Sequence, residues 1–155
     1  MSDDPLADYP KTVVLKDGAQ LVLRPLGAAE DAVLRAFLAR AGPAQRLGGD
    51  PVILACDGER VVAALALERS VPAVARLSVA LDPEYCGRRL GTWLVLDGVH
   101  LAAGLGVERL EATTSAGDAA YLAALERLDF VVDALRTSPS RVVLVKRLHR
   151  EWTDF

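Results

Sequence analysis

Apolar and polar positions along the chain predict eight strands and three helices. Two pairs of strands surround an Asp-Gly turn, one pair in residues 12–26 and the other in residues 51–68. An Asp-Gly pair between apolar stretches is typical of a tight hairpin. The remaining strands are expected over residues 74–83, 107–114, 130–137 and 141–148. The last two of them flank a Ser-Pro-Ser turn, which predicts a further hairpin.

The three helices follow from apolar residues spaced three and four positions apart. In residues 27–42 the expected buried stripe consists of Val33, Leu34, Phe37 and Leu38. A second helix is expected from about Gly91 to Ala103, and a third over residues 117–128. Asp118 is suited to capping the third helix, because a carboxylate accepts the free N–H groups of a first helical turn.

The length of 155 residues favours one domain. We expect an N-terminal tail over residues 1–10, a single domain over residues 11–150 and a C-terminal tail over residues 151–155. The continuous apolar run from Val142 to Val145 is typical of a strand that is covered on both faces. Helices interleaved with such strands predict an α/β fold with a sheet of mixed direction.

Composition and charge narrow the class of function. Hydrophobic residues make up 52% of the chain and charged residues 25%, which is typical of a globular protein. The net charge of −3 predicts no general attraction to nucleic acid. Polar residues interrupt every apolar run before it reaches the length of a membrane span. Cys56 and Cys86 form no zinc or disulfide pattern. We therefore expect a soluble, cytoplasmic protein without a metal and without nucleic-acid or membrane partners.

The segment LDPEYCGRRLGTWLV, residues 81–95, carries the clearest chemical signal. Gly87 and Gly91 bracket Arg88 and Arg89 between a predicted strand and a predicted helix. The first N–H groups of a helix have no intrahelical partners and favour an anion, and arginine binds phosphate oxygens in pairs. The segment therefore predicts a diphosphate or polyphosphate site. An exposed connection without a ligand is the alternative, because the segment is neither a P-loop nor a GxGxxG turn.

Residues 81–114, followed by residues 121–133, resemble the GNAT family of N-acetyltransferases. The pattern of that family is roughly Val-x-Pro-x-Tyr-Arg/Gln-Gly-x-Gly-x-Gly/Ala, then a helix, a strand, a helix and Gly-Phe. The likeness extends from about Lys11 to Leu148, and residues 15–40 are similar to the start of bacterial protein-lysine acetyltransferase domains. The resemblance implies a mostly antiparallel central sheet, splayed in the middle, with helices on both faces.

The same resemblance implies that acetyl-CoA is the cosubstrate. Its pyrophosphate would lie on the turn before the second helix, and its pantetheine arm would run along the strand that ends at Leu81. The N–H group of Val79 would then stabilise the oxyanion of the reaction intermediate. The residues implied in cofactor binding are Val79, Leu81, Cys86, Gly87, Arg88, Arg89, Leu90, Gly91 and Thr92.

The chain departs from the family pattern in the turn and after the third helix. Cys86 stands where the family has Arg or Gln, and Arg89 stands where it has its first glycine. Asp129 replaces the glycine of the Gly-Phe pair.

The usual catalytic positions also differ. Many relatives carry a glutamate base where this chain has Ala75 and Arg76, and a tyrosine acid where it has Leu125. The candidates that remain are Glu68 as the base and Tyr121 as the acid. The alternatives are that Glu68 is a solvated turn residue and that Tyr121 is a core residue.

These features predict an N-acetyltransferase that moves an acetyl group from acetyl-CoA to a primary amine by direct attack. The acceptor is either a small molecule or a protein lysine. The alternative is a non-catalytic module that binds acetyl-CoA or CoA as a sensor, or a fold used only for contacts between proteins. Trp152 and Phe155 are suited to covering either a core edge or a second copy of the chain in a homodimer.

Overall fold

The computed structural model describes residues 6–41, 47–71, 73–85, 89–115 and 118–148. Eight strands, three α-helices and one 3-10 turn occur within these residues. They are β1 (Lys11–Val14), β2 (Gln20–Pro25), α1 (Asp31–Ala41), β3 (Val52–Asp57), β4 (Arg60–Val71), β5 (Val74–Leu81), the 3-10 turn (Pro83–Tyr85), α2 (Leu90–Gly104), β6 (Arg109–Thr114), α3 (Ala119–Arg127), β7 (Val131–Val132) and β8 (Val142–Arg147). This order is the one that the sequence predicts.

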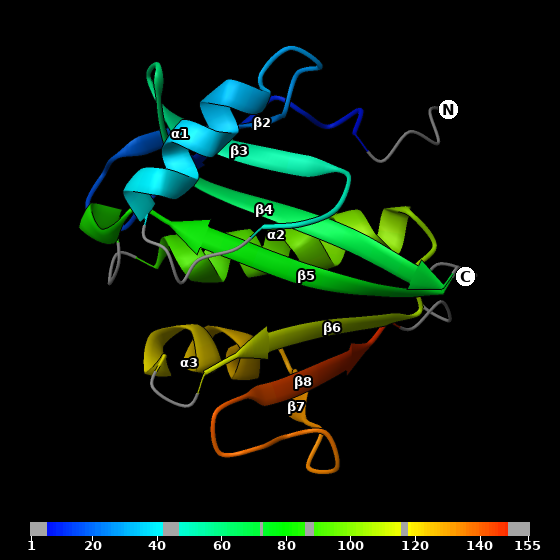
Figure 1. Ribbon diagram of the computed structural model, residues 1–155. Helices are drawn as coiled ribbons and strands as arrows, with labels where there is room; N and C mark the ends of the chain where they lie inside the picture. Colours follow the sequence, from blue (N-terminus) through cyan, green and yellow to red (C-terminus); the bar gives the residue numbers. More distant parts are fainter. Residues whose placement is uncertain (1–5, 42–46, 72, 86–88, 116–117, 149–155) are drawn as a thin grey trace.

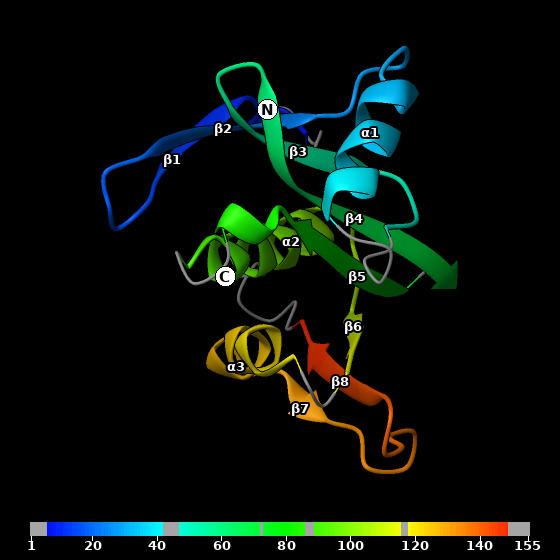
Figure 2. The same ribbon diagram turned by 60° about the vertical axis from the view of Figure 1, so that its left-hand side comes forward.

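The strands form one sheet in the order β1-β2-β3-β4-β5-β6-β8-β7. Neighbouring strands are antiparallel throughout, except that β5 and β6 are parallel. Helix α1 covers one face of the sheet, and α2 and α3 cover the other (Figure 2). The predicted mixed, mostly antiparallel sheet with helices on both faces is therefore confirmed.

The core lies on both faces of the sheet. On the α1 face, Phe37 and Ala41 are buried, whereas Leu34 and Leu38 are partly buried. The prediction that Val33 belongs to the buried stripe is wrong, because 41% of Val33 is exposed. The stripe continues to Ala41 instead, one turn after Phe37 and Leu38.

The last hairpin is shorter on its first strand than the sequence predicts. Strand β7 covers only Val131 and Val132, because the chain turns at Asp133. The Asp133 carboxylate accepts hydrogen bonds from the N–H of Leu135 at 3.2 Å and from Nε of Arg136 at 2.7 Å. These bonds hold the chain in a turn, so residues 133–137 leave the sheet.

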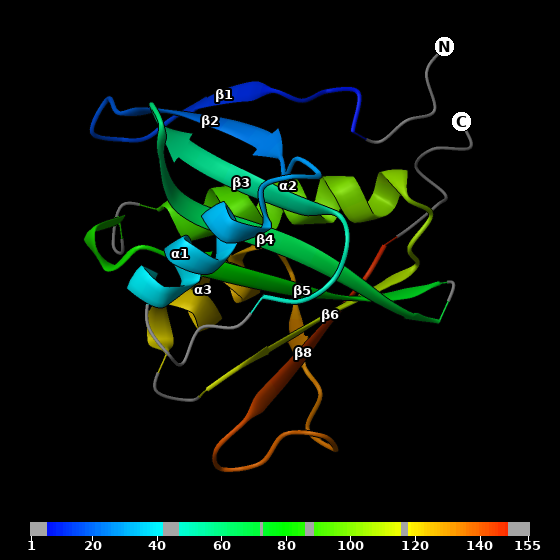
Figure 3. The same ribbon diagram turned by 45° about the horizontal axis from the view of Figure 1, so that its top comes forward.

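Strands β5 and β6 pair along only part of their length. Their register begins at Val74 with Arg109 and ends at Leu77 with Ala112. Strand β5 continues through Ser78–Leu81, and its other edge stays paired with β4. The two strands converge at one end of the sheet and part toward the other (Figures 1 and 3). The predicted splay in the middle of the sheet is confirmed.

Hydrogen bonds join the two halves of the sheet at the end where the strands converge. The carbonyl oxygen of Ala73 accepts the N–H groups of Glu108 at 2.8 Å and Arg109 at 3.0 Å. The Arg69 guanidinium donates to the carbonyl oxygen of Leu105 at 2.6 Å, which ties β4 to the end of α2. This end is closed by backbone bonds, so the parting of the strands opens toward the start of α2.

Helix α2 packs closely against β5 at the point where the strands part. A Cβ atom at Gly98 would lie 2.7 Å from Cδ1 of Leu77, which is too close for the side chain of Leu77 to stay in place. The neighbouring Asp97 is 5% exposed and pairs with Lys11 and with the hydroxyl of Tyr9. The start of β1 is thereby tied to the middle of α2. No helix among the described residues is long and apolar enough to cross a membrane.

Candidate functional site

A cleft of about 930 Å³ opens where β5 and β6 part. Its walls come from the end of β5, the start of α2, the end of β6, one side of α3 and the start of β8. The lining residues are Ser78, Val79, Leu81, Tyr85, Arg89, Gly91, Thr92, Thr113, Thr114, Ser115, Asp118, Ala120, Tyr121, Ala123, Ala124, Arg127, Ser140 and Arg141. The cleft thus joins segments that are far apart in the sequence.

The β5 wall contains two of the residues expected to hold a cosubstrate. Val79 and Leu81 are both partly buried and line the cleft. Among the described residues, no strand pairs with the β6-facing edge of Ser78–Ala80. Backbone N–H and C=O groups at such an edge bond to water or to a ligand. This edge is therefore suited to an extended ligand that takes the place of a strand.

Two polar anchors fix the connection from β5 to α2. Buried Asp82 accepts the N–H of Glu84 at 3.0 Å and the guanidinium of Arg60 at 2.9 Å. These donors lower the pKa of Asp82, although burial acts in the opposite direction. The Tyr85 hydroxyl donates to Asp57 at 2.6 Å. Both anchors reach the β3–β4 hairpin, so that hairpin positions the start of α2.

The start of α2 presents free N–H groups to the cleft. The N–H of Trp93 bonds to the carbonyl oxygen of Arg89, so the N–H groups of the three residues between them precede the first intrahelical bond. No side chain of the described residues caps the helix. Of the residues expected to bind the cosubstrate, Gly91 and Thr92 line the cleft, whereas the side chain of Leu90 is buried in the core. Of the other expected residues, Cys86, Gly87 and Arg88 lie outside the part of the chain that the structure describes.

Three arginines line the cleft without a carboxylate partner among the described residues. They are Arg89 at the start of α2, Arg127 in the last turn of α3 and Arg141 just before β8. Sequence reasoning predicted only Arg89, because the other two become neighbours of the α2 turn only after folding. The cleft contains a single carboxylate from the described residues, that of Asp118.

Asp118 caps α3, as the sequence predicts. Its carboxylate accepts the N–H of Tyr121 at 3.2 Å. The cap fixes the first turn of α3, and the helix then directs Ala120, Ala124 and Arg127 along one side of the cleft.

Tyr121 lies in the cleft wall, whereas Leu125 is fully buried in the core. The hydroxyl of Tyr121 is shielded from solvent and has no hydrogen-bond partner among the described residues. Burial, together with the negative charge of Asp118, raises the pKa of Tyr121 above its ordinary value. Tyr121 is therefore protonated at any ordinary pH and has a hydrogen bond to donate. An unpaired buried hydroxyl costs about 1–3 kcal/mol, which a ligand acceptor would recover.

Glu68 does not line the cleft. It is exposed near the end of β4, directly across from Arg76 in β5. Side chains alternate between the faces of a strand, so Glu68, Arg76 and Ser78 lie on the α1 face. The side chain of Glu68 approaches Gly48, where a Cβ atom would lie 3.0 Å from Oε2. The structure thus brings Tyr121, but not Glu68, into the cleft.

A second carboxylate, Glu111 in β6, was missed by sequence reasoning. Glu111 is 8% exposed and lies opposite Arg76 in the register of β5 and β6. The Arg136 guanidinium binds it through both terminal nitrogens, at 2.8 and 3.2 Å. This pairing holds the pKa of Glu111 below its ordinary value. Glu111 therefore anchors the β7–β8 connection and is a poor acceptor of protons.

A profile of the acetyltransferase (GNAT) family matches residues 24–130. The chain belongs to the GNAT family. Family members use acetyl-CoA to acetylate their substrates. No curated protein sequence has a significant match to the chain.

Solved structures share the fold at low sequence identity. The GNAT domain of S. lividans PAT is 17% identical with a TM-score of 0.80, and the match covers 92% of this chain and 98% of that one. YncA, a putative acetyltransferase from Salmonella typhimurium solved with its cofactor acetyl-CoA, is 16% identical with a TM-score of 0.66, over 83% and 94% of the two chains. A GNAT family acetyltransferase from Elizabethkingia anophelis with acetyl-CoA bound is 12% identical with a TM-score of 0.62, over 83% and 98%.

Two residues that depart from the family pattern have a backbone conformation that favours glycine. Arg89 has a φ of 63° and Asp129 a φ of 68°, both in the left-handed region. A residue with a side chain adopts this region at a cost of about 1 kcal/mol. Asp129 lies outside the cleft, at the end of α3, where glycine is the usual helix stop.

We predict that Arg89→Gly and Asp129→Gly each raise the free energy of unfolding of the ligand-free protein by about 0.5–1 kcal/mol, because glycine relieves the left-handed strain. Arg89→Gln is the matched control and gives no such gain, since glutamine keeps a Cβ atom. Urea denaturation measures all three variants. A loss of stability in both glycine variants would show that neither position is strained.

Proposed function

We propose that this protein is an N-acetyltransferase that moves an acetyl group from acetyl-CoA to a primary amine. The observation that carries the proposal is the cleft between β5 and β6, which runs to the uncapped start of α2. Its shape suits a long ligand with phosphates at one end and a thioester at the other. Family membership supplies the class of reaction.

The phosphates of CoA bind at the helix end of the cleft in this proposal. The N–H groups of Leu90, Gly91 and Thr92 bind the pyrophosphate together with Arg89. Arg127 adds a second cation from α3, on the same face of the sheet. Cys86, Gly87 and Arg88 complete the turn, as the family resemblance implies.

The pantetheine arm bonds to the free edge of β5 and brings the thioester to Val79. The amine nitrogen attacks the thioester carbonyl carbon, and the N–H of Val79 stabilises the resulting oxyanion. The C–S bond then breaks, so the products are the N-acetylated amine and CoA. No enzyme nucleophile takes part, because the two reactants meet directly.

Tyr121 donates a hydrogen bond to the departing sulfur. Its raised pKa makes it a weaker acid than a thiol, whose ordinary pKa is about 8.5. Complete proton transfer from Tyr121 to the thiolate is therefore unfavourable. The phenol lowers the barrier as a hydrogen-bond donor, and the thiolate takes its proton from solvent or from the acceptor amine.

Glu68 is the candidate general base for the amine and lies on the α1 face of the sheet. It shares the α1 face with Ser78, which lines the cleft. Among the described residues of this face, Glu111 and Asp133 are both paired with Arg136, whereas Glu68 pairs with no cation. We assign Glu68 the role of taking a proton from the amine through water.

The proposal predicts tight binding of acetyl-CoA that depends on Arg89. We expect Arg89→Gln to raise the Kd for acetyl-CoA about 10-fold, since one charge-assisted contact with phosphate is lost. Isothermal titration measures the Kd values. The matched control is Arg35→Gln, which removes an exposed arginine of α1 outside the cleft.

Failure of acetyl-CoA to bind would overturn the proposal. Binding without acetylation of any amine across a broad panel would instead support the alternative of a CoA-binding sensor module.

We expect Tyr121→Phe to raise the stability of the protein and to lower its kcat. Removal of the unpaired buried hydroxyl raises the free energy of unfolding by about 1 kcal/mol. Loss of the hydrogen bond to sulfur lowers kcat at least 10-fold, with the Kd for acetyl-CoA unchanged. Because the pKa of Tyr121 is raised above 10, the ratio of the two kcat values stays constant from about pH 6 to 9. Equal kcat values would show that Tyr121 is only a core residue.

A further inference from the structure

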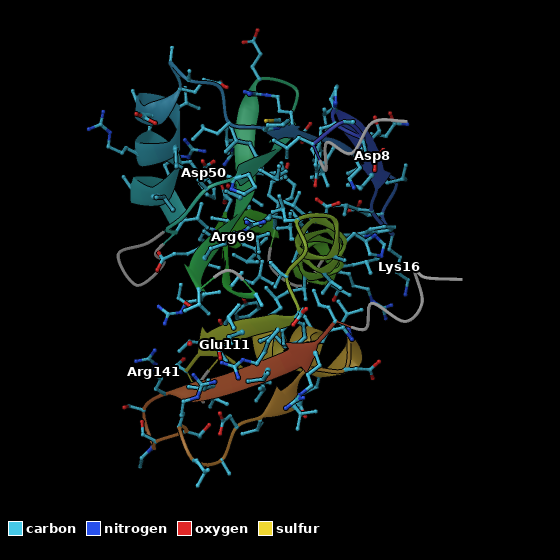
Figure 4. The ribbon with its side chains drawn as sticks, turned by 90° about the vertical axis from the view of Figure 1, so that its right-hand side faces the viewer. Asp8, Lys16, Asp50, Arg69, Glu111 and Arg141 are labelled. Atoms are coloured by element: carbon cyan, nitrogen blue, oxygen red, sulfur yellow. The ribbon has the colours of Figure 1, made fainter. Side chains whose placement is uncertain are left out.

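The arginines of the cleft lie on different faces of the sheet. Arg89 and Arg127 belong to α2 and α3, which cover the same face (Figure 2). Arg141 comes just before β8, where Val142 and Leu144 pack into the core beneath those helices. Alternation along the strand directs Arg141 and Val143 to the opposite face. In Figure 4, Arg141 lies on the α1 side of the sheet, away from α2 and α3.

If CoA binds as in the proposed function, this opposite face is the side that is left open to an acceptor. The phosphates and the arm of CoA occupy the helix side of the cleft in the proposed function. The remaining opening is lined by the hydroxyl groups of Ser78, Thr113 and Ser140, and by Arg141. Thr113 is opposite Val143 in the register of β6 and β8, so Arg141 is about 7 Å along the strand from the level of Thr113.

The carboxylates of Glu111 in β6 and of Asp133 in the β7–β8 connection pair with other cations. Glu111 pairs with Arg136 at 2.8 Å and with Arg109 at 3.3 Å. Asp133 pairs with Arg136 at 2.7 Å. Arg141 forms no ion pair with any residue that the structure describes. Arg141 is therefore the one cation that the described residues contribute to the acceptor side of the cleft, and it lies beside neutral hydroxyl groups, whereas the unpaired Glu68 of this face does not line the cleft.

We propose that the acceptor is an amine that also carries an anionic group, such as the carboxylate of an amino acid, and that Arg141 binds this group. This inference rests on the proposed function and specifies its substrate class. A guanidinium binds a carboxylate or a phosphonate through two parallel hydrogen bonds. It repels a cationic lysine side chain on a protein surface, and the one carboxylate that the described residues contribute to the cleft, that of Asp118, caps α3.

The chemical step is that of the proposed function. The amine nitrogen of the acceptor forms a bond to the acetyl carbon, the C–S bond breaks, and one proton passes from nitrogen through water to Glu68, while the CoA thiolate takes a proton from solvent. The anionic group takes no part in these bonds. Its contact with Arg141 orients the amine toward the thioester, so Arg141 determines specificity.

Matched pairs of acceptors test the inference. Each pair consists of an amino acid, or an aminophosphonate, and the amine that remains when the anionic group is replaced by hydrogen. A lysine-containing peptide completes the panel. We expect kcat/KM to be at least 10-fold higher for the anionic member of the preferred pair. Arg141→Gln should lower that value about 10- to 100-fold, mainly through KM, without changing the KM for acetyl-CoA.

Two further variants separate recognition from general effects. Arg141→Lys keeps the charge but loses the paired geometry, so its kcat/KM should lie between those of the wild type and Arg141→Gln. Arg147→Gln removes an exposed arginine of the same strand that does not line the cleft, and should have no effect.

Preference for the uncharged amines or the lysine peptide would overturn the inference, as would a rise in the KM for acetyl-CoA in Arg141→Gln. Acetyl-CoA binding without turnover of any acceptor would also overturn the inference about the acceptor, but the proposed CoA-binding site would still be supported. Absence of acetyl-CoA binding would overturn the proposed function itself.

Discussion

Strands β5 and β6 stop pairing after Leu77 and Ala112, and the rest of the site depends on this loss of contact. They form the only parallel pair among the described strands, and parallel pairing is slightly weaker per residue than antiparallel pairing. Each strand follows its other neighbour, β4 or β8. Helix α2 packs on β5 through the contact of Gly98 with Leu77, so β5 stays with α2 while β6 diverges. The sheet remains one body because backbone bonds of Ala73 close the opposite end.

The parting creates two kinds of binding surface in one cleft. On the helix side, the uncapped start of α2 and the arginines of α2 and α3 favour phosphates. On the α1 side, the ion pairs of Arg136 with Glu111 and Asp133 neutralise the nearby carboxylates and fix the β7–β8 connection. Arg141 is thereby left without a partner among the described residues. Electrostatics thus separates the proposed cosubstrate from the proposed acceptor across the thickness of the sheet.

The sequence predicted the elements because they depend on local patterns. The order of helices and strands along the chain and the Asp118 cap follow from periodicity and local composition, and the family motif singled out Val79, Leu81, Gly91 and Thr92, which line the cleft. The sequence did not predict the contacts between segments that are far apart along the chain. Arg127 and Arg141 reach the cleft only through the packing of α3 and β8, and nothing near Glu111 in the sequence indicates its pairing with Arg136.

The structure also shows the backbone conformation of two residues that depart from the family pattern, which the sequence did not predict. Arg89 and Asp129 both have the left-handed backbone conformation that glycine adopts most readily. Amide hydrogen exchange by NMR, with and without acetyl-CoA, tests the central claim most directly. The account predicts that acetyl-CoA protects the amide of Val79 in β5, together with those that start α2, and leaves the β1–β2 hairpin unchanged. Unchanged exchange at the free edge of β5 under saturating acetyl-CoA would contradict the account.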